Sequence, residues 1–258
     1  MPIVTNANYV EPAPSEMLWR YMDLAKFISI ATSQGLWFSN AQELAKIDPY
    51  EGFFPGASTS WVVPFDPNIG GEAVMGVGLD PMAQVIFANP RQAEIMRGSF
   101  SINCWHSASE EAFLMWKSYG VHDFAVAIVS DLGRMQKAFA KSPENIFCGR
   151  ISYTNYADFM SNFKNGEDII MNKRLPFKSE NEVRLVYTHG IGKFPQGLSI
   201  RCSLDDLIAQ LWISPTAPPW FAQSVQAFCK LAGLACPVAV SPLLTLPHLI
   251  AQDRPRPW

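Results

Sequence analysis

The stretch KRLPFKSENEVRLVY, residues 173–187, holds the side chains best suited to chemistry. Pro176 prevents a helix from running through it. Apolar and charged residues then alternate with a period of two, which is typical of a half-buried strand. Glu180, Glu182 and Arg184 would project from one face of that strand, because successive side chains point to opposite sides. Two carboxylates beside a guanidinium form either a catalytic edge or a solvated face whose charges pair with one another.

Further polar side chains lie at the ends of other predicted strands. Arg20 stands where a strand over residues 17–21 meets a helix, and it could hold a phosphate or stack on neighbouring rings. The residues from Asn103 to His106 end a second strand, in which Trp105 could stack on a ligand or pack in the core. These side chains are candidates for the same site as the carboxylate pair.

Composition limits the class of protein. The 258 residues are 48% hydrophobic and 17% charged, which suits a globular chain with a large core. A net charge of −3 argues against broad non-specific nucleic-acid binding, which needs a strongly basic face. The five cysteines show neither metal-ligand spacing nor a disulfide framework. There is no signal pattern and no apolar run of about 18 residues, so we expect a cytoplasmic protein with no membrane partner.

The pattern of elements predicts an α+β fold. Asp23 is a good helix N-cap and Gly35 would stop that helix, while the apolar run FAVAIV from Phe124 indicates a central strand. A capping-box pattern from Ser107 predicts a helix reaching Gly120. Strands and helices mix without a βαβ period, which favours a mixed, twisted sheet flanked by helices. We expect an irregular arm over residues 1–16, one domain over 17–245 and a loose tail over 246–258.

Six segments in order along the chain carry a resemblance to a known family. They read WRYMDLAKFISIATSQGLWFS, DPYEG, INCWHSASEEAFLMWKSYG, FAVAIVSD, MNKRLPFKSENEVRLV and WISPTAPPW. Over residues 18–241 the chain resembles the bacterial family known as domain of unknown function 2971. That name implies little chemistry.

The chain is also similar, more remotely, to ADP-ribosyltransferase folds, which carry three spaced elements. Arg20 with the following helix would be the first element, Ser101 to His106 the second, and Glu180-Asn181-Glu182 the third. The second element reads SINCWH in place of a Ser-Thr-Ser triplet. The resemblance implies NAD as substrate, an unknown acceptor macromolecule or water, and a role as a toxin or phage-defence effector.

This second resemblance implies a role for each candidate. Glu182 would stabilise an oxocarbenium-like ribose, Glu180 would orient or deprotonate the acceptor, and Arg20 would hold a phosphate. The complete implied NAD-binding set is Arg20, Tyr21, Ser101, Asn103, Trp105, His106, Phe177 and Arg184.

Two alternatives come from other classes of protein. A metal-dependent nuclease or hydrolase could hold a divalent ion with Asp48, Glu51, Glu180 and Glu182, provided that the DPYEG turn lies beside the Glu180 strand. A non-catalytic sensor or binding module could use the long Gly- and Pro-rich loop over residues 53–78. Consumption of NAD without added metal would favour the ADP-ribosyltransferase. Loss of activity with a chelator would favour the nuclease or hydrolase, and inactivity in both tests would leave the binding module.

Overall fold

The computed structural model describes residues 3–52, 90–120, 123–155, 166–189 and 195–246. The predicted loop over 53–78, most of the helix expected from Asn155 to Phe163, and all but the first residue of the expected tail lie outside these residues. No helix among the described residues is long and apolar enough to cross a membrane.

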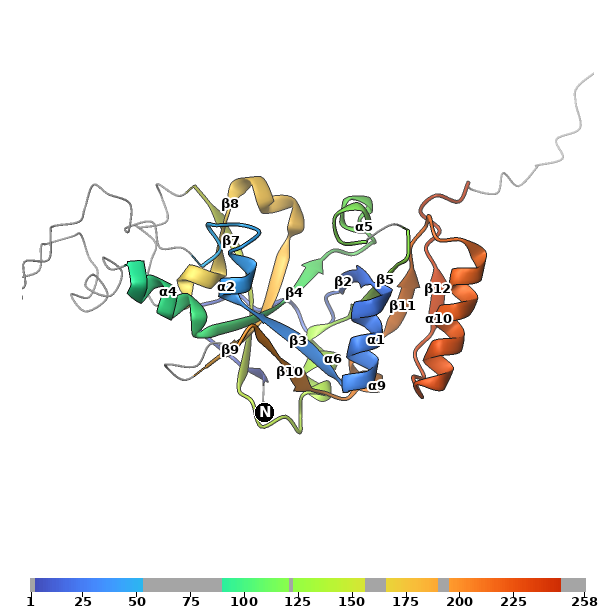
Figure 1. The fold of residues 1–258 in the computed structure, drawn as a ribbon, viewed down its shortest axis with the longest axis horizontal. Coiled ribbons are helices and arrows are strands. Elements are labelled where there is room, and N and C mark those ends of the chain that lie inside the picture. The colour runs from blue at the N-terminus through green and yellow to red at the C-terminus, as the bar shows by residue number, and fades with distance from the viewer. Residues whose placement is uncertain (1–2, 53–89, 121–122, 156–165, 190–194, 247–258) are drawn as a thin grey trace, which may run out of the picture.

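A ten-stranded mixed sheet organises the described residues (Figure 1). Eight strands follow in this spatial order: β1 (Ile3–Val4), β6 (Ile146–Arg150), β9 (Glu182–Thr188), β4 (Phe100–Ser107), β2 (Leu18–Asp23), β5 (Ala125–Ser130), β11 (Gln210–Ile213) and β12 (Val238–Val240). The β1–β6 and β11–β12 pairs are parallel, and the other pairs along this path are antiparallel. The prediction of a single α+β unit with a mixed sheet is confirmed.

The sheet divides at β4. One edge of β4 pairs with β9 over its whole length. The other edge is shared: its last two residues pair with β2, while Ser101 and Ile102 pair with β3 (Gly35–Asn40), which in turn pairs with β10 (Gly197–Arg201). The backbone between these two pairings, around Cys104, has no strand partner on that side within the described part of the chain. This gap lies beside the candidate site.

Three apolar clusters cover the sheet. The largest packs α1 (Leu24–Ser33), α6 (Leu132–Ala138), α9 (Leu204–Leu207) and α10 (Pro219–Leu231) against one face, around Trp105, Val126 and Leu185. On the other face, one cluster packs α8 (Asp168–Met171) against Ile102 and Val186, and another packs α5 (Phe113–Tyr119) against Trp19 and Tyr21. The charged side chains of β9 lie on this divided face.

The remaining described elements are short or peripheral. A separate parallel pair, β7 and β8, precedes a 3-10 helix, η2, that leads into β9. Their bounds, with those of α2 and α4, are β7 (Ser152–Thr154), β8 (Asn172–Arg174), η2 (Leu175–Glu180), α2 (Ala41–Leu44) and α4 (Pro90–Gly98).

Local sequence cues were right for α1 and wrong for α5. The Asp23 carboxylate accepts from the Lys26 backbone N–H at 2.8 Å, as an N-cap does. The capping-box prediction fails because Ser107 is the last residue of β4, where its hydroxyl donates to Glu16. The helix therefore begins only at Phe113, after an Ala112 that makes no side-chain cap.

The amino-terminal arm, expected to be irregular over residues 1–16, contains one two-residue strand, and residues 5–16 have no helix or strand. Ile3 and Val4 form β1 on the edge of β6. The Tyr9 ring stacks on Phe147 with centroids 5.5 Å apart, and its hydroxyl donates to Asp168 Oδ1 at 2.9 Å. A strand of two residues is too short to show the alternation of apolar and polar residues by which a strand is recognised in a sequence.

Candidate active site between strands β2, β4 and β9

The charged side chains of β9 are buried, which corrects the expectation of a half-buried strand. Glu182 begins the strand opposite His106, and Arg184 lies opposite Cys104. Their side chains are 5% and 1% exposed. Opposite residues of an antiparallel pair share a face, so these four side chains occupy the region between the two smaller apolar clusters. One of the two interpretations of the sequence was that these charges pair with one another on a solvated face. They do pair, but in the interior of the protein.

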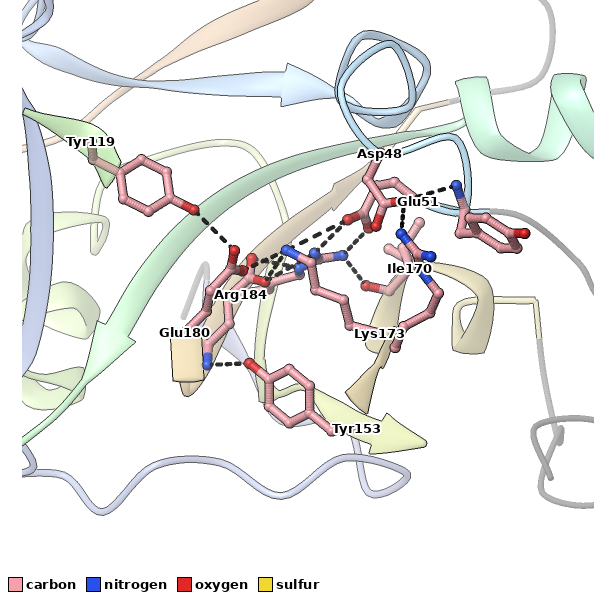
Figure 2. A network of polar contacts seen from close by, with 11 residues as sticks. Asp48, Glu51, Tyr119, Tyr153, Ile170, Lys173, Glu180 and Arg184 are labelled. Carbon is pink, nitrogen blue, oxygen red and sulfur yellow. Dashed lines mark hydrogen bonds and ion pairs between the residues drawn. The ribbon is translucent and has the colours of Figure 1, made fainter. Parts of the chain in front are cut away.

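Arg184 uses all five of its N–H groups on protein acceptors. Its Nε donates to Glu182 Oε1 at 2.8 Å and one Nη donates to Glu182 Oε2 at 3.1 Å. The same guanidinium donates to both Glu51 oxygens, at 2.5 and 3.0 Å, and to the Ile170 carbonyl at 2.5 Å (Figure 2). A guanidinium has five donors, so Arg184 is fully occupied within the protein. Its burial and bonding fit a structural cation and leave it no donor for a ligand.

The carboxylate of Glu180 approaches that of Glu182 by a different route from the one predicted. Glu180 ends η2 and is not on the strand, because Asn181 adopts a left-handed conformation with φ 37°. Lys173 of β8 nevertheless joins the two carboxylates, with Nζ 2.5 Å from Glu180 Oε2 and 3.3 Å from Glu182 Oε2. The Tyr119 hydroxyl lies 3.4 Å from Glu180 Oε1. Glu180, at 19% side-chain exposure, is the more accessible carboxylate.

Arg20 alternates with Trp19 and Tyr21 and pairs with Ile128, so its side chain starts on the face of β2 opposite the carboxylates, and only its guanidinium reaches the gap along β4. Its guanidinium donates to the Cys104 carbonyl at 2.6 Å, in the stretch of β4 that neither β2 nor β3 covers. Burial lowers the pKa of this guanidinium, and the nearby Cys104, Tyr119 and Glu182 side chains act in the opposite direction. Arg150, Lys173 and Arg184 each form ion pairs with carboxylates. The contact found for the Arg20 guanidinium in the described part of the chain is a neutral carbonyl.

Three more of the predicted residues border this region. His106 Nδ1 lies 2.6 Å from the Glu180 carbonyl, and the Tyr21 ring is 6.3 Å from the His106 ring. The Tyr21 hydroxyl accepts from the Ala112 backbone and its ring packs in the α5 cluster. Phe177 is partly exposed, with Lys173 Nζ 4.9 Å from its ring centroid.

The structure does not bring Ser101, Asn103 or Trp105 to the carboxylates. These residues alternate with Cys104 and His106 along β4, so they lie on the opposite face. Trp105 Nε1 donates to Asn103 Oδ1 at 2.7 Å, and Asn103 donates to the Trp37 carbonyl at 2.8 Å. The Ser101 hydroxyl is 2.7 Å from His189 Nε2. All three are buried and satisfied by the protein.

The DPYEG turn does lie beside β9, as the metal hypothesis required. Glu51 meets Arg184, and Asp48 Oδ1 accepts from Arg174 at 2.9 Å. These carboxylates are thus matched by cations. No cluster of three or more Asp, Glu, His or Cys side chains in the described ranges has the geometry to hold a metal ion. The arrangement fits a buried charge network better than a metal centre.

The charges in the network keep the buried carboxylate ionised. Burial alone would raise the pKa of Glu182, but the Arg184 and Lys173 charges outweigh it and lower the pKa to about 2. Burial would lower the pKa of Lys173, but Glu182, Glu51 and Glu180 raise it above the ordinary value against the opposing charge of Arg184. Burial lowers the pKa of Arg20. Glu182 and Lys173 are therefore both charged at neutral pH.

Sequence reasoning missed Lys173 and Tyr119 as members of the site. In the sequence, Lys173 stands beside Arg174 and near Lys178, and this local basic group has no spacing that points to the carboxylates. Tyr119 ends a predicted helix that carried no polar pattern pointing to a ligand. Neither residue has a spacing from Glu182 that marks it, because η2 and α5 bring them there through tertiary packing.

Two surface cavities lie elsewhere. One of about 850 Å³ is bordered by the amino-terminal arm, Glu144, Phe147 and Tyr187. The other, about 290 Å³, lies between Trp116 and Ser214. Neither is lined by Arg20, Glu180 or Glu182.

Comparison with known proteins adds little to this geometry. No family model and no curated protein matches the chain, so membership of the domain of unknown function 2971 family is not confirmed. Among solved structures, the chain is similar to Thermus sp. 2.9 DarT in complex with NAD+, with 11% identity and a TM-score of 0.39 over 90% of this chain and 98% of that one. The carba-NAD+ complex gives 11% identity and a TM-score of 0.38 over 89% and 96%. At this degree of similarity neither structure decides the activity of this chain.

Proposed function

We propose that this protein cleaves the bond between nicotinamide and ribose in NAD and passes ADP-ribose to an acceptor or to water. The observation that supports the proposal best is that the Arg20 guanidinium reaches the Cys104 carbonyl of β4, near enough to Glu182 for the charge of that carboxylate to act on it, while Lys173 joins Glu182 to Glu180. These residues come from distant parts of the chain and from different elements. Their chemistry matches the two charged ends of the proposed reaction, an anionic diphosphate and a developing ribosyl cation.

Glu182 would stabilise the transition state. As the bond between ribose C1′ and the pyridinium nitrogen breaks, nicotinamide leaves with the bonding electron pair and positive charge develops on the ribose. A carboxylate held ionised in a water-poor setting is effective against such a charge. Substrate hydroxyls would have to take over the acceptor positions that Lys173 uses on Glu182.

Glu180 is placed to handle the acceptor. It is more exposed than Glu182 and lies 3.4 Å from the hydroxyl of Tyr119, whose side chain is exposed. An acceptor oxygen or nitrogen would form the new bond to C1′ while its proton passes to Glu180, which keeps charge and atoms balanced. Arg20, with no ion pair to a carboxylate among the described residues, is the cation best placed for the diphosphate.

A metal-dependent hydrolase is a weaker candidate, because Glu51 and Asp48 already pair with Arg184 and Arg174. A non-catalytic sensor or binding module, the third hypothesis, would use the loop over residues 53–78, which lies outside the described residues. The role as a toxin or phage-defence effector stays a proposal, which induced expression with measurement of cellular NAD and growth would test.

The test is release of nicotinamide from NAD by the purified protein, followed by chromatography with and without EDTA. We expect turnover that EDTA does not affect. Arg20→Ala should raise KM, and Glu180→Gln should lower turnover about 10²-fold or more. Arg134→Ala is the matched control, since Arg134 is an arginine paired with Asp131 in α6, a helix that packs on the opposite face of the sheet from the carboxylates. An unchanged KM in Arg20→Ala together with unchanged turnover in Glu180→Gln would refute the assignment, and EDTA-sensitive activity would favour the hydrolase.

A further inference from the structure

Lys173 reaches the carboxylates from outside the main sheet. It stands in β8, which pairs with β7 in a separate two-stranded sheet, so its position does not follow from the pairing of β9. Its Nζ lies 2.5 Å from Glu180, 3.3 Å from Glu182 and 4.0 Å from Glu51. At 12% side-chain exposure it is largely removed from water. One ammonium group thus touches three acidic side chains from three segments of the chain.

Each carboxylate depends on Lys173 to a different degree. Glu51 and Glu182 both also contact Arg184, through two hydrogen bonds each. The ion pair found for Glu180 within the described ranges is the one with Lys173. Removal of Lys173 would therefore leave Glu180 beside Glu182 with no cation between them.

Other ionisable or charged groups also face this point from every packed element: Arg20 from β2, Cys104 and His106 from β4, Tyr119 from α5, Tyr153 from β7, Arg184 from β9 and Glu51 from the turn.

We infer that Lys173 is a positioning residue of the proposed active site, whose ammonium lies between the Glu180 and Glu182 carboxylates and holds them side by side. The inference rests on the proposed function for its kinetic consequence. Its structural consequence is independent. Two carboxylates that share a partly buried site cannot both ionise easily, and one then keeps its proton to a higher pH. An ammonium between them removes that repulsion.

Lys173→Met tests the inference, with Lys178→Met as the matched control. Lys178 is an exposed lysine in η2, five positions further along, and among the described residues its ammonium forms no ion pair with the carboxylates. With NAD as substrate, Lys173→Met should move the acid limb of the turnover profile upward by about one to two pH units and lower turnover at pH 6 about 10-fold or more. Lys178→Met should keep the wild-type profile. Lys173→Arg keeps the charge and should restore the position of the acid limb, whatever its effect on turnover.

A second measurement needs no activity. With glutamate labelled at the side-chain carboxyl carbon, Lys173→Met should show a carboxyl group titrating about one to two pH units higher than any in the same region of Lys178→Met. Thermal unfolding gives a further check if Lys173→Met is too unstable to titrate. Adding Glu180→Gln removes the repulsion and should recover part of the melting temperature that Lys173→Met loses.

The outcomes separate the inference from the proposed function. If the wild-type protein releases no nicotinamide but the titration and the recovery by Glu180→Gln occur, the function is wrong and the positioning role of Lys173 stands. If wild-type protein turns over NAD and Lys173→Met has the same pH profile and carboxyl titration as Lys178→Met, the inference is overturned. Additive losses of melting temperature in Lys173→Met and Glu180→Gln would also overturn it.

Discussion

Glu182 is an ionised carboxylate in the interior, and its charge depends on its two cationic neighbours. Taking a carboxylate out of water is costly, and an unpaired one would take up a proton. Arg184 and Lys173 supply hydrogen bonds to both Glu182 oxygens. Glu51 in turn balances the Arg184 charge. The group is therefore stable as a unit, and removing one member leaves an unmatched buried charge.

The first prediction concerns stability in acid. The folded-state pKa of Glu182 is depressed from 4.5 to about 2. A depressed carboxylate pKa contributes stability above the unfolded-state pKa, and that stability is lost as the pH falls through the window between the two values. The loss from this group between pH 5 and pH 2 should be about 3 kcal/mol.

Urea unfolding at intervals between pH 7 and pH 3 measures this slope. Glu182→Gln cannot titrate, so its unfolding free energy should fall less steeply with acid than that of the wild type. Glu43→Gln removes an exposed carboxylate paired with Lys46 and should keep nearly the wild-type slope. Parallel curves for Glu182→Gln and wild type would show that the carboxylate is not held ionised by its neighbours.

At the scale of elements, β4 decides where the site lies. Its pairing with both β2 and β3 on one edge leaves the Cys104 carbonyl without a strand partner there, and Arg20 satisfies it. Buried carbonyls need such a partner. The gap also determines which residues meet: Cys104 and His106 share a face with Glu182, while Asn103 and Trp105 share the opposite one.

The sequence predicted elements well where the determining contacts are local. The Asp23 cap and the apolar run of β5 both reflect neighbours in the chain. Ser107 fitted a cap equally well but bonds to Glu16, 91 positions away. We expected Ser101, Asn103 and Trp105 to lie near the carboxylates, and they do not, for a similar reason. The order of the strands predicts that they come near β9, but the face of each residue depends on the register of β4 with β9.

The second prediction tests how β3 meets β10. The end of α1 was expected at Gly35, but Gln34 adopts the left-handed conformation there, with φ 50°. Gly35 is required for another reason. A Cβ at this position would lie 2.6 Å from the Ile200 carbonyl oxygen and 2.8 Å from Ser199 Oγ. Gly35→Ala should lower the free energy of unfolding by roughly 1–3 kcal/mol, because backbone of the paired strand must move.

Chemical denaturation of Gly35→Ala, Ser199→Gly and the double variant separates the two contacts. Ser199→Gly removes the side-chain contact but leaves the Ile200 carbonyl in place. The double variant should therefore stay less stable than Ser199→Gly alone. If Gly35→Ala is as stable as wild type, the close approach of β3 and β10 is wrong.

At the scale of the whole molecule, segments far apart in sequence meet in ways that local patterns do not encode. The α+β class followed from the mixture of strand and helix patterns. The docking of the Asp48–Gly52 turn onto β9 joins residues 133 positions apart, through the Glu51–Arg184 pair. Charge complementarity allowed that contact but did not select it, because many acidic turns and basic strand residues could pair.

The amino-terminal arm provides the third prediction. Arg150 N–H donates to the Val10 carbonyl at 2.9 Å, and Tyr9 packs on Phe147 and bonds to Asp168. If the arm is integral to the fold, Tyr9→Ala should lower the free energy of unfolding by about 2 kcal/mol, through loss of a half-buried aromatic ring. Tyr9→Phe should cost about 1 kcal/mol, through loss of the hydroxyl bond.

Val10→Ala is the control for the arm, because its side chain is 70% exposed and its backbone contact survives the change. Its stability should stay within about 0.5 kcal/mol of wild type. Limited proteolysis gives an independent measure, since cleavage near residue 9 requires the arm to leave β6. Tyr9→Ala should be cut faster there than Val10→Ala. Equal stability and equal cleavage in both variants would mean that the contacts of Tyr9 with Phe147 and Asp168 do not hold the arm against β6.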